Sequence, residues 1–310
     1  VLLIATGTLL SVPVLVRAYE PETTHKALTQ EIVLLFNNYN SGLALNDFDR
    51  ALVVRGSFDE DAGMRALHHF YDPVNNKGIT IGGEWIHAKR WAEDTLAQAS
   101  SILRAENIYG NIVSYFSSDS DFSWERAIYE YVWGDKDRGL KTLGHILHLI
   151  EDMAVPEHTR NDPHPPYADR VFHQASPYEH WADKWNVGNV SIASDLISTN
   201  RVPMLCVSLG ACFDLMAKYS NNNFFSKDTI LKGYSSPNIT SEVLEQGNGY
   251  DFLFGYFSNS LGEKYKIVKI DYGLDNLPEY SIIDRNNLIL TDYWSHLSKQ
   301  AVLHGAGVMK

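Results

Sequence analysis

Residues 145–158 (HILHLIEDMAVPEH) contain several metal-ligating side chains, spaced to suit a helix and the turn that follows it. His148 and Asp152 are four residues apart, so on a helix they lie on one face, one turn apart. Pro156 cannot continue a helix without losing a hydrogen bond, so the chain must turn there and can bring His158 back towards the helix end. Zn²⁺ in proteins is bound by imidazole nitrogen and carboxylate oxygen. The spacing predicts a three-ligand metal site with zinc as the first candidate; the alternative is a helix whose histidines have structural roles only.

Histidine is distributed unevenly along the rest of the chain. Six of the twelve histidines fall within residues 145–180, and four more lie at or near predicted helices upstream. His173 and Glu179 form a second ligand pair on the loop and helix that follow the first unit. His145 lies beside the face that carries His148, where it and Glu151 are candidates to orient the ligands; the alternative for both is a helix-face residue with no metal role.

Composition limits the class of protein. The chain has 310 residues, of which 45% are hydrophobic and 21% charged, so it is long enough to bury a core in one or two domains. The net charge is −12, and no run of five basic residues occurs. A broad electrostatic surface for duplex nucleic acid is therefore not expected, although bound metal ions can supply positive charge locally.

The first sixteen residues carry no charge and include Pro13. This run is short for a membrane span and resembles the apolar part of a secretory signal peptide over residues 1–18, with cleavage after Ala18. The protein is therefore expected to be secreted or periplasmic; a buried N-terminal helix or strand is the alternative. Cys206 and Cys212 are too few for a cysteine zinc site, and form either a disulfide or two buried thiols.

Apolar periodicity predicts a mainly α-helical body, with a less regular C-terminal third. A Gly56-Ser57 turn is expected between the second and third helices. A short alternating pattern over 264–272 is consistent with a strand. The predicted helices cover 22–40, 47–55, 61–70, 84–106, 123–133, 136–153, 179–185, 203–219 and 289–304.

Four motifs resemble the zinc-dependent phospholipase C and S1/P1 nuclease superfamily. They occur in the family's order within residues 19–185, and the C-terminal 120 residues match no family motif. LGHxxHLxxDxxxPxH over 143–158 resembles the superfamily signature, and HFYDP over 69–73 resembles a segment of bacterial phospholipases C. YEHWAD over 178–183 and Thr24-His25 are weaker matches.

The resemblance implies a multi-helix fold with three zinc ions in a cleft over residues 19–200, followed by a C-terminal extension over 201–310. One zinc would be bound by Asp61, His69, His148 and Asp152. A second would be bound by Asp152, His25 and the main chain of Tyr19 at a processed N-terminus. The third would be bound by His158, His173 and Glu179. Asp61 would also be the catalytic general base.

The sequence departs from the family pattern at three places. Tyr19 stands where the family has tryptophan, but ligation by the main chain does not need that side chain. Asp61 is preferred as the upstream aspartate, with Asp59 close behind. His173 and Glu179 are six residues apart instead of one helical turn. Two further histidines therefore compete for the His173 position: His164 and, more weakly, His180.

The function implied is that of an exported zinc-dependent phosphodiester hydrolase of the phospholipase C type. Its partners would be a phospholipid or other phosphodiester substrate and, transiently, a membrane surface. Two alternatives remain at this point. One is a single-strand nuclease of the S1/P1 type, and the other is a zinc-stabilised binding module without catalytic activity.

Overall fold

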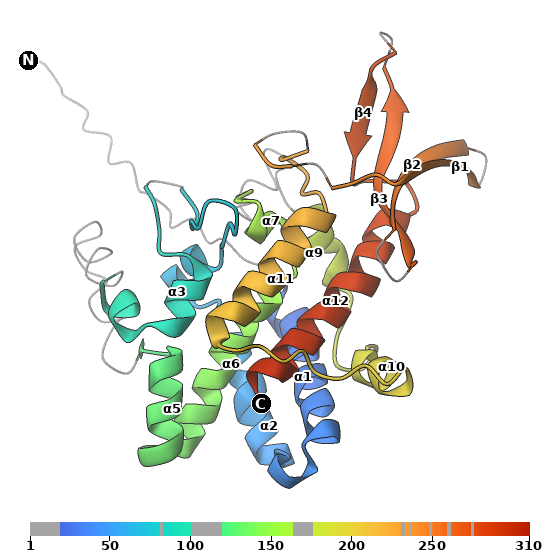
Figure 1. Cartoon of the computed structure of the whole chain (residues 1–310). Coiled ribbons are helices and arrows are strands. Elements are labelled where there is room, and N and C mark those ends of the chain that lie inside the picture. Colours follow the sequence, from blue (N-terminus) through green and yellow to red (C-terminus); the bar gives the residue numbers. More distant parts are fainter. Residues whose placement is uncertain are drawn as a thin grey trace, which may run out of the picture.

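Helix α6 (Lys136–Asp152) is the central helix of the fold and contacts α-helices on several sides (Figure 1). Asp135 caps its first turn, because the side-chain oxygen accepts hydrogen bonds from the main-chain nitrogens of Asp137 and Arg138. From Gly144 onwards every residue of the helix is buried. The prediction of a helix over 136–153 is confirmed to within one residue.

The computed structural model describes residues 19–80, 83–100, 120–163, 176–230, 233–235, 237–247, 250–258, 262–273 and 276–310. Within these ranges the protein is mainly α-helical, with a small antiparallel sheet. The predicted signal peptide over 1–18 lies outside them. The shorter helical elements are η1 (Pro21–His25), η2 (Ser41–Leu43), η3 (Gly63–His68), α3 (Ala88–Glu93), α7 (Pro156–Thr159), α9 (Pro177–Ala182) and α10 (Ile192–Ser198). The longer ones are α1 (Lys26–Tyr39), α2 (Asp47–Asp59), α5 (Trp124–Trp133), α11 (Leu209–Asn223) and α12 (Leu288–Val308).

Helix α2 packs closely on α6 through two glycines. A Cβ atom on Gly56 would overlap the carbonyl oxygen of Lys141, and one on Gly144 would overlap the carbonyl oxygen of Val53. The predicted turn at Gly56-Ser57 is therefore wrong: α2 runs through both residues, and glycine is required there by the contact between two helix backbones.

The prediction of one continuous helix over 84–106 is also wrong, because the helix is interrupted at Asp94. Helix α3 ends at Glu93, and Asp94 has an extended backbone with φ −119° and ψ 114°. The Asp94 side chain accepts hydrogen bonds from the main-chain nitrogens of Leu96 and Ala97, which starts a new helical segment over 95–100. The rest of the predicted range, 101–106, lies outside the described residues.

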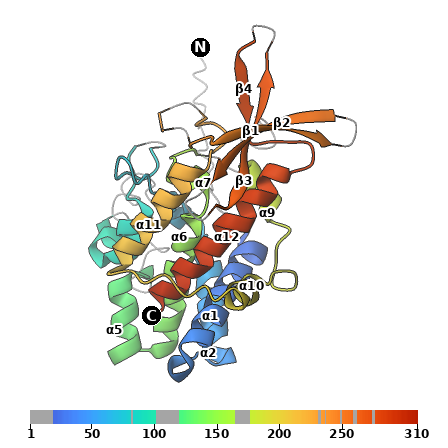
Figure 2. The same ribbon diagram turned by 45° about the vertical axis from the view of Figure 1, so that its right-hand side comes forward.

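The C-terminal third is more regular than predicted. Four antiparallel strands form a sheet in the order β1 (Ser241–Gly247), β2 (Tyr250–Ser258), β3 (Lys264–Tyr272) and β4 (Pro278–Ser281). The predicted strand over 264–272 is confirmed as β3, which packs on α12. Figure 2 shows the sheet at one end of the helices, with its hairpins extending away from them.

Helix α12 joins the C-terminal third to the core of the N-terminal helices. It packs on α1, and a Cβ atom on Gly305 would overlap the side chain of Ile32. Leu28 and Ile32 of α1 and Leu297 and Ala301 of α12 are fully buried in one apolar cluster. The described core is therefore continuous across the predicted boundary at residue 200. No helix in the described ranges combines the length and the apolar character needed to cross a membrane.

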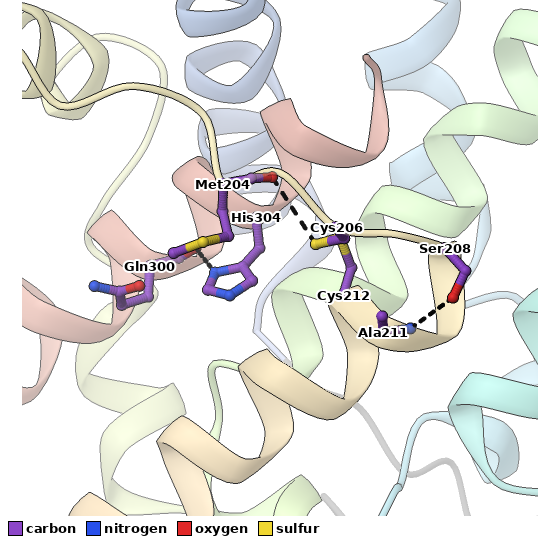
Figure 3. The surroundings of a disulfide bond; sticks show 7 residues. All are labelled: Met204, Cys206, Ser208, Ala211, Cys212, Gln300 and His304. Carbon is purple, nitrogen blue, oxygen red and sulfur yellow. Dashed lines mark hydrogen bonds between the residues drawn. A yellow bond between two sulfur atoms is a disulfide. The ribbon is translucent and has the colours of Figure 1, made fainter.

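Cys206 and Cys212 form a disulfide, shown in Figure 3. Cys206 lies in the extended segment before α11, and Cys212 lies in the first turn of that helix, with 5.4 Å between the two Cα atoms. The main-chain nitrogen of Met204 also donates to the carbonyl oxygen of Leu303 in α12, at 2.9 Å. The segment between α10 and α11 is thus held to α11 covalently and to α12 by its backbone. Of the two possibilities left open by the sequence, the structure has the disulfide.

Candidate metal centre

Two overlapping groups of buried histidine and aspartate side chains meet at the C-terminal end of α6. Within each group, one ligand atom of every residue lies within 4.8 Å of the others, so these groups could hold a metal ion. Helix α6 supplies His148 and Asp152. His25 is the last residue of η1, Asp61 lies just after α2, and His69 directly follows η3. The groups are His25, Asp61 and His148, and His69, His148 and Asp152.

The carboxylate of Asp152 lies between histidines on both of its oxygens. Oδ1 is 3.5 Å from Nε2 of His25. Oδ2 is 3.1 Å from Nδ1 of His69 and 3.5 Å from Nε2 of His148. A carboxylate placed in this way can bridge two cations, one on each oxygen.

Hydrogen bonds fix the orientation of two of these imidazoles. His148 Nδ1 lies 2.8 Å from the carbonyl oxygen of Ser57, to which it must donate, so Nε2 faces the cluster with its lone pair. His25 Nδ1 lies 2.6 Å from Oε2 of Glu151, and Nε2 is buried with no hydrogen-bond partner among the described residues. Thr29 donates to the other oxygen of Glu151 at 2.6 Å. Imidazoles that ligate metals are commonly held by such outer contacts.

Burial keeps the histidines of the cluster neutral. It lowers the pKa of His69 to about 3, and it lowers the pKa values of His25 and His148 well below their usual range. The neutral imidazole is the form that ligates a metal ion. Burial also raises the pKa of Glu151 well above its usual range; the hydrogen bond from Thr29 opposes this, and the nearby carboxylates add to it. A cluster rich in carboxylates and poor in cationic groups is suited to a positive ion.

A second buried pair, His158 and Glu179, lies next to His69. His158 Nε2 is 3.1 Å from Oε1 of Glu179, and His158 Nδ1 donates to the carbonyl oxygen of His69 at 3.0 Å. Ser176 caps α9 and holds Glu179 in its first turn. The structure therefore brings together two of the three ligands expected for the third metal. The third, His173, and its competitor His164 lie outside the described residues.

The chain reaches His158 in a different way from that predicted. The chain turns between the end of α6 at Asp152 and Pro156, and Pro156 is not the residue that ends α6. Pro156 instead begins α7, where a missing main-chain N–H costs nothing. Val155 before it is extended, with φ −102° and ψ 115°, as expected for a residue that precedes proline. His180, the weaker competitor, is 80% exposed and faces away from the buried cluster.

The structure separates the two candidate upstream aspartates. Asp61 is buried, and its Oδ1 is 3.6 Å from Nδ1 of His69 and 3.7 Å from Nε2 of His148. The Asp59 carboxylate instead lies 2.8 Å from Arg55 and 2.6 Å from Lys141, outside the cluster. The geometry favours Asp61, and its role as a ligand stays a prediction.

Tyr19 lies beside the cluster through its side chain. Its ring is 5.6 Å from the His25 ring, edge on, and its hydroxyl donates to that of Tyr178 at 2.8 Å. Both tyrosines are fully buried. Ligation by the main chain of Tyr19 stays a prediction.

Glu60 is a buried residue of the site that the sequence reasoning missed. Its Oε2 accepts from Nδ1 of His145 at 2.6 Å and from Nε of Arg65 at 2.8 Å, and its Oε1 accepts from Nε1 of Trp91 at 3.0 Å. Burial alone would raise the Glu60 pKa, but the Arg65 charge and the His145 hydrogen bond hold it well below its usual range. The only sequence signal was its place between the two aspartates. Both residues predicted to orient ligands have a buried partner near the cluster. His145 contacts Glu60, and Glu151 contacts the predicted ligand His25.

Comparison of the chain with protein-family models and with curated proteins found no match.

Proposed function

We propose that this protein is an exported, zinc-dependent phosphodiester hydrolase of the phospholipase C type. The observation that carries the proposal is the placement of Asp152, with one oxygen facing His25 and the other facing His69 and His148. Pairs of metal ions bridged by a carboxylate are typical of phosphoester hydrolysis, because they stabilise the attacking and the leaving oxygen together.

The residues present fit zinc. They offer neutral imidazole nitrogens and carboxylate oxygens, two of the imidazoles are oriented by hydrogen bonds, and the unsatisfied His25 Nε2 points at Asp152. His158 and Glu179 would hold a third ion, with His173 as the proposed further ligand. Bound zinc would lower the pKa of water and neutralise the charge of the phosphoryl group.

The side chains have separable roles in this proposal. Asp61 would accept the proton of the attacking water, because one oxygen of its carboxylate lies 3.6 Å from Nδ1 of His69 and 3.7 Å from Nε2 of His148, where the ion would be held. Glu151 and the Ser57 carbonyl would hold His25 and His148 in the ligating tautomer. The buried position of the cluster would exclude bulk water and strengthen each of these electrostatic interactions.

The proposed location is outside the cytosol. The disulfide between Cys206 and Cys212 supports it, since such bonds persist mainly in oxidising compartments. The apolar segment at residues 1–18 supports it independently, by its resemblance to a signal peptide. The preference for phospholipid rests on the HFYDP segment over residues 69–73.

The test measures bound metal and hydrolysis together. The purified protein is analysed for metal content and assayed on short-chain phosphatidylcholine and on single-stranded DNA, with and without a chelator. Asp61→Asn should lower chelator-sensitive hydrolysis by roughly 10²–10⁴-fold, as expected for loss of a general base. Asp59→Asn is the matched control, and it should leave the rate within about twofold, because its carboxylate pairs with Arg55 and Lys141 outside the histidine cluster.

Each other outcome selects a different function. Activity on DNA alone would replace the phospholipase with a single-strand nuclease. Bound zinc without chelator-sensitive activity on either substrate would replace the enzyme with a zinc-stabilised binding module. Absence of bound metal would overturn the whole proposal.

A further inference from the structure

Glu60 is the point at which several elements around the metal centre meet. It follows α2 directly and is fully buried. Its carboxylate contacts Arg65 from η3, Trp91 from α3 and His145 from α6, all within 3.0 Å. A buried anion with this many donors is strongly held in one orientation. Four segments of the chain are therefore fixed relative to one another through a single side chain.

One oxygen of this carboxylate also faces a predicted ligand. Glu60 Oε1 lies 3.8 Å from Nε2 of His69, while Nδ1 of the same ring faces Asp152 at 3.1 Å. If Nδ1 is to ligate a cation, the ring proton must be on Nε2, which is the nitrogen on the Glu60 side. Trp91 Nε1 donates to this same Oε1 at 3.0 Å and so holds the oxygen in place.

We propose that Glu60 is a positioning residue for the metal centre: its negative charge, 3.8 Å from Nε2 of His69, favours the tautomer that presents Nδ1 to the ion, and its hydrogen bonds hold the surrounding segments in place. The inference rests on the proposed metal-dependent function. Glu151 has a related place beside His25, where a carboxylate is hydrogen-bonded at 2.6 Å to the ring nitrogen that faces away from Asp152; Glu60 lies farther from His69, at 3.8 Å, and acts on that ring through its charge.

The Glu60–His145 hydrogen bond adds a second effect of the same residue. His145 lies three residues before His148 on α6, and Asp61 follows Glu60 directly. A bond of 2.6 Å between Glu60 and His145 therefore ties the backbone that carries Asp61 to the helix that carries His148. Loss of the Glu60 charge should loosen three predicted ligands of one metal site together.

The test compares Glu60→Gln with Glu31→Gln. Glu31 is a matched control, because it is also a buried carboxylate but lies outside the cluster. It accepts a hydrogen bond from the main-chain nitrogen of Ala193, which lies at the start of α10. Zn²⁺ affinity is measured by competition with a chelator, the visible spectrum is recorded after loading with Co²⁺, and folding of the metal-free protein is followed by circular dichroism. Glu60→Gln should bind Zn²⁺ about 10–100-fold more weakly and change the Co²⁺ spectrum. Glu31→Gln should lower only the melting temperature.

Trp91→Phe is the second variant, in case Glu60→Gln does not fold. It keeps an aromatic ring in the core but removes the donor that fixes Oε1 of Glu60, so it should weaken Zn²⁺ binding several-fold and shift the Co²⁺ spectrum in the same direction. Native Zn²⁺ affinity and an unchanged spectrum in either folded variant would refute the role of Glu60 while leaving the proposed function intact. Failure of the unmodified protein to bind Zn²⁺ would instead refute the proposed function.

Discussion

Gly144→Ala tests whether the close contact between α2 and α6 positions the candidate metal centre. The added Cβ would overlap the carbonyl oxygen of Val53, and Gly56 and Ser57 lie next to it on α2. An ordinary contact needs about 3.5 Å between the two atoms, so the helices must separate by on the order of 1 Å. Both partners are backbone or Cβ atoms, and no flexible side chain can move aside to relieve the overlap.

Two losses follow from this separation. Overpacking of a tight core contact costs about 1–3 kcal/mol of the free energy of unfolding. For a chain of this size, that corresponds to a fall in melting temperature of roughly 2–5 °C. The hydrogen bond from His148 Nδ1 to the Ser57 carbonyl, now 2.8 Å, would also stretch beyond a useful length. His148 would lose the contact that sets its tautomer, so metal affinity should fall by about 10–100-fold.

Thermal unfolding of the metal-free protein and Zn²⁺ competition measure the two losses separately. Gly42→Ala is the matched control: a Cβ there meets nothing within 4 Å, so stability and metal affinity should stay close to native. Gly144→Ala with native stability would show that the helices do not depend on this contact. A destabilised Gly144→Ala that binds Zn²⁺ normally would show that the crossing supports the fold but not the position of His148.

Three further predictions concern charge, pH and redox state. Asp152→Asn should lose more bound metal than His145→Ala, because Asp152 faces histidines on both oxygens; the reverse order in metal analysis would contradict the bridging role. Burial lowers the pKa of His68 to about 3, so below pH 6.5 the unfolded chain binds a proton that the folded chain does not. Each such histidine should therefore remove about 1.4 kcal/mol of stability per pH unit as the pH falls, and a flat melting-temperature profile from pH 6.5 to 5 in the metal-free protein would oppose this. Cys206→Ser with Cys212→Ser should cost about 2 kcal/mol for a loop with a sequence separation of 6, measured by denaturant unfolding; an unchanged midpoint would show that the bond adds nothing.

The elements that the sequence predicted well are those whose signals are local. Helices α1, α5, α6 and α12 show apolar periodicity over ten or more residues, and strand β3 has a short alternating pattern. The pairing of His148 with Asp152 is likewise a local property, since a spacing of four on one helix places both on one face. The structure agrees with each of these because tertiary packing did not oppose the local preference.

The errors arise where a distant segment decides the local structure. Gly56 indicates a turn when read with its neighbours, but it lies in a helix because the Lys141 carbonyl, 85 residues later, occupies the place of a side chain. Strands β1 and β2 lie in a segment rich in Asn, Ser and Gly, and their regularity comes from pairing with each other and with β3. Neither the helical state of Gly56 nor the pairing of β1 and β2 can be read from the residues next to them in the sequence.

Asp59, Glu60 and Asp61 illustrate the same limit within the site. Successive residues at a helix end point about 100° apart, so three consecutive acids reach three different surroundings. Asp59 meets Arg55 and Lys141 near the surface, Glu60 meets donors from three other elements, and Asp61 faces the histidines. All three positions carry an acidic side chain, and they differ mainly in the direction in which that side chain points. That direction depends on how α2 lies on α6, and α2 approaches α6 closely at Gly56, where a turn was predicted. The same contact therefore helps to place Asp61 at the candidate metal centre.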